Sequence, residues 1–389
     1  MIHHAREYET THPWLHFELK VESLGAVHWM LLGEIRSKIE HLRNTPLKPE
    51  TAQEMRTVSL ARGAHATVAI EGGTLTEDQV RQAVDGTLEL PASQQYREQE
   101  IDNVITAFNQ INAGADEYGN LFGLTFEGMQ DINRQVLNEL PREDWIRPGE
   151  ISLKAVGVAR YLGAPREDCE YLLERLCEWI NGSYFRRDES EDWQCPLRVI
   201  AAIVAHVYFE LIHPFGDGNG RVGRMLEFQV LRASGVPSVA AHLLTNHYNE
   251  TRDEYHRHLA AVSARDDLIP FLQYAVRGFA EQLTLHIEQV HEQQWADRWE
   301  QLIYERFGNR NSEADVRRRN LALAISRQGL EGLVRIADIP TLTPKLAAAY
   351  ATKSAMTVTR DINALVELEL IERDGRRSVR PLVDQLAVD

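Results

Sequence analysis

The chain has 389 residues, enough for two or three domains, and 43% of them are hydrophobic, which excludes a wholly disordered protein. Its formal net charge of −16 argues against nucleic-acid binding by the protein as a whole. The charge is uneven, because residues 316–381 hold 12 Lys and Arg against 7 Asp and Glu, a local charge of +5, and the remainder carries −21.

The apolar segments and the cysteine content of the chain indicate the compartment in which the protein is expected to function. We find no apolar run as long as a membrane span, and the N-terminus lacks the apolar stretch of a secretory signal peptide. The three cysteines, Cys169, Cys177 and Cys195, form no CxxC pair and are expected to be reduced thiols. We therefore predict a cytoplasmic protein that does not contact a membrane.

Helical apolar spacing dominates the first hundred residues. Residues 20–48 alternate apolar and charged positions and predict one amphipathic helix. A second helix is predicted from about Glu50 to Glu71, followed by Gly72-Gly73 as in a left-handed cap. A capping box that begins at Thr76 predicts a third helix over 77–84.

The next hundred residues predict more helices and one β segment. Helical spacing covers 96–111, 125–140 and 166–182. The stretch from Ile151 to Tyr161 instead holds β-branched and small residues, which favours β structure.

A long apolar run and a glycine-rich loop follow. Residues 195–212 are apolar enough for a buried helix, and Pro214 ends it because the residue before a proline disfavours the helical conformation. The helical pattern resumes over 221–233. The loop between them therefore leads into a helix N-terminus, whose unpaired N–H groups and partial positive charge suit a phosphate.

The loop and the start of the second helix carry residue types that bind anions. Gly216, Gly218 and Gly220 let the backbone approach a bound group closely. Arg221 and Arg224 are three residues apart, so they share a helix face and can hold phosphate oxygens with forked hydrogen bonds.

Two further residues of the loop carry chemistry. Asp217 is a hard oxygen ligand of the kind that holds Mg²⁺ between phosphates, and His213 has a side chain that exchanges a proton near neutral pH. From His213 to Arg224 the sequence HPFGDGNGRVGR matches the motif HPFx(D/E)GN(G/K)RxxR at every defined position. The chain therefore resembles the Fic family over roughly residues 50–275.

The resemblance implies a mainly α-helical bundle with a small β-hairpin flap and a protein adenylyltransferase activity. Such an enzyme transfers AMP from MgATP to a Ser, Thr or Tyr hydroxyl of a target protein. His213 would remove the hydroxyl proton and Asp217 would hold Mg²⁺. The nucleotide-binding residues implied in the motif are Gly216, Gly218, Asn219, Gly220, Arg221 and Arg224.

An inhibitory helix is implied at about residues 50–72. The run from Thr67 to Gly72, TVAIEG, resembles the motif (S/T)xxxE(G/N) of many Fic proteins. In that family the glutamate, here Glu71, pairs with the second arginine, here Arg224, and takes the place of the γ-phosphate. The alternative is a solvated glutamate at a helix end.

Further roles carry over from the family. Tyr248 and Asn249 are implied to seat the adenine and ribose. A flap would align the target backbone by strand addition, and a purely structural hairpin is the alternative. Ser152 stands where the family commonly has an arginine, which leaves the anchoring of the flap open. The implied target-binding positions are Ile151, Val156 and Val158.

The C-terminal region resembles a winged helix. Residues 278–306 predict a long charged helix that serves as a connector or a dimer element. Beyond a linker, three helices near 316–327, 344–350 and 357–368 precede a hairpin at 371–380. DNA contact and protein docking both fit this region. The residues predicted on the exposed side of the third helix are Thr357, Thr359, Arg360 and Asn363.

Four regions are thus predicted: an N-terminal helical region (1–100), a Fic catalytic core (101–275), a connector helix (276–310) and a winged-helix-like module (311–389). Two other functions fit the same residues, namely removal of AMP from a modified target and a nucleotide-sensing DNA-binding regulator. Self-modification and a homodimer are also compatible with the sequence.

Overall fold

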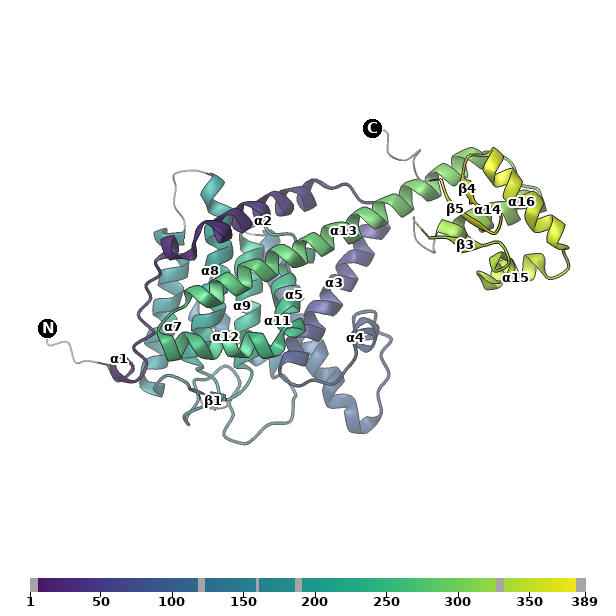
Figure 1. Cartoon of the computed structure of the whole chain (residues 1–389). Coiled ribbons are helices and arrows are strands. Elements are labelled where there is room, and N and C mark those ends of the chain that lie inside the picture. The colour runs from purple at the N-terminus through teal and green to yellow at the C-terminus, as the bar shows by residue number, and fades with distance from the viewer. Residues whose placement is uncertain (1–5, 118–122, 159–160, 186–190, 327–331, 383–389) are drawn as a thin grey trace. The chain divides into compact units, whose positions relative to one another are not determined.

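The computed structural model describes two compact units, Met1–Ile287 and Glu288–Asp389 (Figure 1). The residues described are 6–117, 123–158, 161–185, 191–326 and 332–382. The long helix α13 (Ile269–Phe307) runs from the first unit into the second, and it begins nine residues before the predicted helix 278–306 and ends one residue after it.

The first unit is mainly helical. Before α13 its helices are α1 (Tyr8–Thr11), α2 (Ala26–Asn44), α3 (Pro49–Ile70), α4 (Glu77–Val84), α5 (Gln95–Glu117), α6 (Phe126–Val136), α7 (Arg166–Asn181), α8 (Glu191–Ile212), α9 (Asn219–Ala233), α10 (Ser238–Ala241), α11 (Leu243–Glu250) and α12 (Arg252–Arg265). Short 3₁₀ turns lie at Val21–Leu24, Ala92–Gln94 and Ser183–Phe185.

One predicted helix is divided in two. Residues 20–48 contain a 3₁₀ turn at Val21–Leu24 and then α2, and Gly25 between them has φ 85°. This left-handed conformation is accessible to glycine without strain and breaks the helical path. The apolar spacing alone did not reveal the break.

Helix α8 is the centre of the first unit and packs against α2, α7 and α9. Apart from Arg198, its residues from Leu197 to Ile212 are buried, and each fully buried Val, Leu, Ile or Phe side chain contributes roughly 1.5–3 kcal/mol. The stretch Gln194–Ile212 is long and apolar enough to cross a membrane, but 89% of its most apolar segment is buried inside the protein. The expectation that no run reaches this length was therefore wrong.

The predicted β segment forms a short hairpin. Strand β1 (Gly157–Val158) pairs antiparallel with β2 (Tyr161–Leu162), and an isolated bridge joins Ile151 to Phe215. The ladder is shorter than the predicted stretch 151–161 and ends one residue beyond it. We call the described residues 151–158 and 161–164 the flap.

The second unit contains the three helices and the hairpin that the sequence predicts. Its helices are α14 (Glu313–Ser326), α15 (Pro344–Tyr350) and α16 (Ala355–Glu367), with a 3₁₀ turn at Ile339–Thr341. Its strands are β3 (Val334–Arg335), β4 (Ile371–Asp374) and β5 (Ser378–Pro381), in the antiparallel order β3-β5-β4. The sequence did not indicate β3, because a two-residue strand has no detectable alternation.

A buried carboxylate holds the helices of the second unit together. Asp361 of α16 accepts hydrogen bonds from Arg317 and Arg318 of α14 and from the hydroxyl of Tyr350 on α15. The opposite side of α16 is solvent-facing: Thr359, Arg360 and Asn363 are exposed and Thr357 is half-buried. DNA contact through this face stays a prediction.

Close packing of α3 gives a test of the fold. A Cβ atom on Gly63 of α3 would lie 2.2 Å from Nδ1 of the buried His242, whereas one on Gly33 of α2 would meet nothing within 4 Å. We expect Gly63→Ala to lower the free energy of unfolding by about 1–3 kcal/mol through overpacking. The matched control Gly33→Ala should leave stability unchanged or raise it by up to about 1 kcal/mol. Urea denaturation measures both, and equal stability of the two variants would contradict the packing described.

Candidate active site

His213 lies at the point where α8 ends, held in a left-handed backbone conformation with φ 51°. Its side chain is 7% exposed. The ring atom Nδ1 lies 3.3 Å from the Glu210 carbonyl oxygen, which can only accept a hydrogen bond, so Nδ1 carries the proton. Nε2 is then left with its lone pair, as a general base requires.

Burial also keeps this imidazole neutral. It lowers the pKa of His213 below its ordinary value, and the hydrogen bond to Glu210 and the charges of Glu71 and Asp217 oppose that shift. The lone pair is therefore available at neutral pH.

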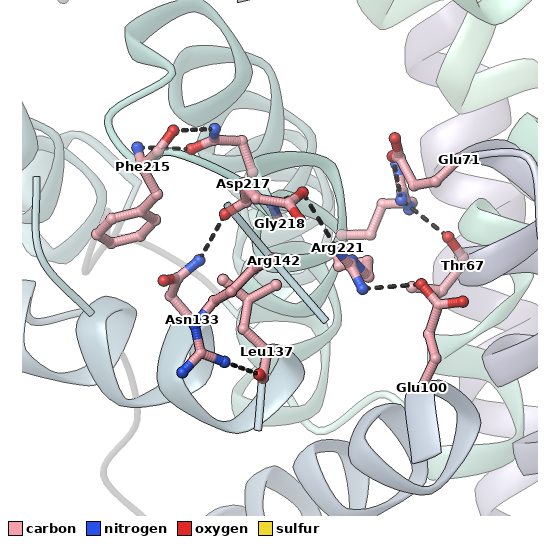
Figure 2. A network of polar contacts seen from close by, with 12 residues as sticks. Thr67, Glu71, Glu100, Asn133, Leu137, Arg142, Phe215, Asp217, Gly218 and Arg221 are labelled. Atoms are coloured by element: carbon pink, nitrogen blue, oxygen red, sulfur yellow. Dashed lines mark hydrogen bonds and ion pairs between the residues drawn. The ribbon is translucent and has the colours of Figure 1, made fainter. Parts of the chain in front are cut away.

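Two buried amides hold the loop after His213 in shape (Figure 2). The side chain of Asn219 donates to the Phe215 carbonyl (2.7 Å) and accepts from the Phe215 N–H (2.9 Å). Asn133 of α6 donates to the Asp217 carbonyl at 2.9 Å and accepts from the Gly149 N–H at 2.8 Å. Asn219 was predicted to bind nucleotide, but its side chain is occupied within the loop, so the amide shapes the site instead.

The loop leads into α9 with the geometry of an anion site. Gly218 is the N-cap and has φ 79°. Gly216 is closely covered, since a Cβ there would lie 3.1 Å from Trp145. The first backbone N–H groups of α9 have no acceptor within the helix, which leaves them for an outside ligand.

Arg224 is paired with the carboxylate that the sequence singled out. Its guanidinium donates to Glu71 Oε1 at 2.7 Å and to the Thr67 carbonyl at 2.9 Å. The arginine side chain is 1% exposed and that of Glu71 is 43% exposed. Burial alone would raise the pKa of Glu71, but the charge and hydrogen bond of Arg224 outweigh it and hold that pKa below its ordinary value.

Arg221 is also paired with carboxylates. It donates to Glu100 Oε1 of α5 at 2.8 Å and lies 3.3 Å from Asp217 Oδ1 (Figure 2). Burial raises the pKa of Glu100, and the charge of Arg221 opposes the rise. The sequence did not identify Glu100, because no motif or local spacing connects α5 to the loop. Both arginines are thus neutralised by carboxylates of the protein.

Gly220 makes room for the inhibitory-motif glutamate. A Cβ atom at this position would lie 2.0 Å from Glu71 Oε1 and 3.1 Å from an Arg224 guanidinium nitrogen. A side chain at residue 220 would therefore require the Glu71 carboxylate to shift from this position.

A cavity of about 320 Å³ opens in front of these groups. It brings together four predicted residues, His213, Glu71, Gly220 and Arg224. The lining residues that the sequence did not identify are Tyr161 of the flap, Glu210 and Leu211 of α8, and Tyr255, His256, Leu259 and Ala260 of α12. Residues 255, 256, 259 and 260 have the spacing of one helix face. The sequence does not show that this face of α12 lies beside the loop, so the spacing alone could not identify them as site residues.

Tyr248 and Asn249 lie outside this cavity, which corrects the expectation that they seat the nucleoside. The Tyr248 side chain is fully buried, donates a hydrogen bond to Glu227 at 2.8 Å, and stacks with the rings of His206 and Tyr255. Asn249 is half-buried on the same helix, α11. The residues Tyr255, Leu259 and Ala260 of α12 give the cavity an aromatic and apolar side.

The flap is attached to the loop through backbone groups. Besides the bridge from Ile151, the N–H of Ser152 donates to the Pro214 carbonyl at 2.9 Å, and the Val156 carbonyl accepts from the Gly163 N–H. Val158, the third predicted position, is in strand β1. Ser152, which stands where the family commonly has an arginine, therefore anchors the flap to the loop through a main-chain hydrogen bond.

Asp217 fits a magnesium ion held mainly by phosphates. Its side chain is 47% exposed, and Oδ1 accepts from the Gly218 N–H and faces Arg221. Among the described residues there is no cluster of three or more His, Cys, Asp or Glu side chains that could bind a metal. One carboxylate completed by substrate oxygens is a common way for proteins to hold Mg²⁺.

Comparison with known proteins agrees with this architecture. Residues 123–231 match the model of the Fic/DOC family. The structure is similar to a Fic family protein from Desulfovibrio desulfuricans G20, with a TM-score of 0.56 and 20% identity, covering 92% of this chain and 96% of that one. It is also similar to residues 134–508 of Fic-1 from Caenorhabditis elegans, with a TM-score of 0.56 and 21% identity over 70% of this chain and 75% of that one.

The fold is thus a helical Fic fold, and residues 123–231 are the part of the chain that is similar to the Fic/DOC family. In sequence it is 28% identical over 250 residues to the protein adenylyltransferase fic-1 of Caenorhabditis briggsae and 27% identical over 246 residues to that of Caenorhabditis elegans. Each alignment covers 63% of this chain and 44% of the relative, so the chain spans less than half of these proteins.

The buried Glu227 beneath Tyr248 gives a pH-dependent test. Burial raises the pKa of Glu227 to about 8, with the Tyr248 hydrogen bond and the Arg224 charge opposing. Because the folded pKa is raised, the stability that the protonated carboxyl contributes is present below about pH 4.5 and is lost as the pH rises towards 8.

We expect Glu227→Gln, which keeps the acceptor for Tyr248, to raise the free energy of unfolding on the order of 2 kcal/mol at pH 7 and little at pH 4.5. Denaturation at both pH values measures this. Glu40→Gln on the exposed face of α2 is the control and should change little at either pH. A Glu227→Gln effect that does not grow between pH 4.5 and 7 would contradict a buried, protonated Glu227.

Proposed function

We propose that the chain is a protein adenylyltransferase that moves AMP from MgATP to a Ser, Thr or Tyr hydroxyl of a target protein and is held inactive by Glu71. The observation that carries the proposal is the ion pair of Arg224 with Glu71, 2.7 Å long, in the cavity that also contains His213. The adenylyltransferase names of the relatives fit the same activity.

The phosphates bind at the N-terminus of α9. The free N–H groups that follow Gly218 donate hydrogen bonds to the phosphate oxygens, and Arg221 and Arg224 exchange their carboxylate partners for phosphate. The nucleoside lies along the α12 face with Tyr255 and Leu259, where the cavity is lined by aromatic and apolar groups.

His213 provides the base for the transfer. Nε2 takes the proton of the acceptor hydroxyl while the acceptor oxygen forms a bond to the α-phosphorus. The bond from that phosphorus to the oxygen bridging to the β-phosphate breaks, and pyrophosphate leaves. Positioning and charge neutralisation supply most of the rate in reactions of this kind. Mg²⁺ on Asp217 would add positive charge beside the phosphates.

Glu71 inhibits by occupying the position of a phosphate. Its carboxylate takes the Arg224 donor that the terminal phosphate needs, and its charge repels that phosphate. A triphosphate that enters beside Glu71 is therefore displaced, and its α-phosphorus is not in line with the acceptor oxygen.

Removal of this carboxylate should activate the enzyme. We expect Glu71→Gly to increase AMP transfer by at least about tenfold, because one charge-assisted hydrogen bond of roughly 1.5–3 kcal/mol no longer holds Arg224. Glu71→Gln, which keeps the shape but not the charge, should give an intermediate rate. His213→Ala in the Glu71→Gly background should abolish transfer.

Incubation with α-labelled ATP and a lysate, followed by mass spectrometry, reports both the transferred group and the acceptor. Equal labelling by wild type and Glu71→Gly would refute inhibition by Glu71. Labelling that survives His213→Ala would refute the role of the imidazole.

The pH profile tests the imidazole separately. Because burial lowers the pKa of His213, its neutral form persists below pH 6.5, and removal of the Glu71 charge lowers that pKa further. We expect kcat/KM for ATP of Glu71→Gly to fall only below pH 6.5. An acid limb centred above pH 6.5 would show that another group limits the reaction.

The reverse reaction is the second candidate, because Glu71 lies in the same cavity as His213 and a carboxylate there can activate water. A purified AMP-modified target distinguishes the two directions. AMP release that is fast in wild type and lost in Glu71→Gly would assign hydrolysis to this chain.

A further inference from the structure

The residues before α2 hold the flap from outside the motif. We call residues 6–14 the brace. Its first part is fixed to α7: Arg6 lies 3.2 Å from one oxygen of the buried Asp168, and the Tyr8 N–H donates to the other at 2.9 Å. The Arg6 guanidinium also lies 3.8 Å from the centre of the Tyr171 ring.

The second part of the brace binds the flap directly. His12 is buried, and its Nε2 lies 2.9 Å from the carbonyl oxygen of Leu162 in β2. Since a carbonyl only accepts, Nε2 donates this hydrogen bond. The other ring nitrogen, Nδ1, lies 2.9 Å from the Thr11 hydroxyl, so both nitrogens are occupied and the ring orientation is fixed.

Trp14 continues this contact to the catalytic helix. Its ring centre is 5.2 Å from that of His12 and 6.2 Å from that of Tyr161 in β2. The Trp14 indole N–H lies 3.4 Å from the Tyr161 hydroxyl, which itself donates to the Leu211 carbonyl at 2.5 Å. Leu211 is two residues before His213, so the brace, the flap and the catalytic base are joined by consecutive contacts.

The flap needs such support. Its ladder pairs only Gly157 with Leu162 and Val158 with Tyr161. An isolated two-stranded hairpin is marginal in water even when it is longer. The main-chain bonds of Ser152 and Ile151 fix one end of the flap, and the brace fixes the strand at the other end.

The brace also forms part of a second cavity. This cavity, of about 350 Å³, lies beside His213 and is lined by Thr11 and His12 on one side and by Ile151 and Val156 of the flap on another. A peptide added along the flap would therefore meet the brace as well as the strand.

We propose that His12 and Trp14 are positioning residues for the acceptor: they hold β2 in the register in which an extended segment of the target aligns with His213. This inference rests on the proposed transfer to a protein hydroxyl. Neither residue touches the reacting atoms, so their effect is on the alignment of the acceptor and not on proton transfer.

The experiment uses the full chain and measures amide hydrogen exchange of Gly163 and Ala164, whose N–H groups bond to Val156 and Ile212. His12→Phe keeps a ring beside Trp14 but removes the donor to Leu162. We expect exchange at both amides to be about fivefold faster, the effect of losing one hydrogen bond. His12→Gln keeps an N–H donor and should restore the wild-type rate. His16→Ala is the matched control in the same segment, because His16 is exposed and pairs with Asp266.

Unchanged exchange at both amides in His12→Phe and His12→Ala would overturn the proposal, as would an equal increase in His16→Ala. If His12→Ala loosens the whole unit, seen as faster exchange of the Val222 amide in α9, then His12→Phe alone decides, because it keeps the buried volume.

A kinetic arm separates positioning from a merely structural role. In the Glu71→Gly background, His12→Phe should reduce self-transfer of AMP about fivefold and leave KM for ATP within about twofold. A parallel loss of ATP affinity would contradict positioning of the acceptor. If Glu71→Gly transfers no AMP to any protein, the proposed function fails, while the exchange rates still decide whether the brace holds the flap.

Discussion

A buried positive charge needs a partner, and this constraint organises the first unit. The Arg224 guanidinium has almost no exposure to solvent, so its charge must be balanced within the protein or by a ligand. In the structure the partner is Glu71, which reaches it from the C-terminal end of α3. The position of α3 against α9 and α11 is therefore tied to the state of the anion-binding loop. Glu71 also terminates α3, so the ion pair joins the end of this helix to α9.

The loop motif was predictable because its chemistry is contiguous. His213, Asp217 and the arginines lie within twelve residues, so spacing alone places them together, and the structure brings His213, Gly220 and Arg224 to one cavity. Glu71 was predictable only through the resemblance of its own short motif.

Other parts of the site depend on tertiary contacts that no local pattern encodes. Glu100 comes from α5, and Tyr255 comes from a helix whose orientation follows from the packing of the core. The expectation for Tyr248 failed for the same reason, since its full burial follows from core packing that no local pattern shows. In the fold, long periodic helices were predicted well, whereas the break at Gly25 and the two-residue strand β3 left no periodic signal.

The net charge of the second unit does not measure how much positive charge its surface presents. The basic excess of residues 316–381 lies in the second unit, yet Arg317 and Arg318 are used by the buried Asp361. Part of the local positive charge is thus structural. Arg360 remains exposed on α16 and is available to a partner, so the count of basic residues overstates the charge that a ligand would meet.

The absence of a side chain at residue 220 makes room for the Glu71 carboxylate beside Arg224. Glu71 approaches this backbone so closely that a single methyl group would exclude the carboxylate from its place. A substitution at residue 220 would therefore disturb the pairing of Glu71 with Arg224 and leave the residue at position 213 unchanged, so the two parts of the cavity can change independently.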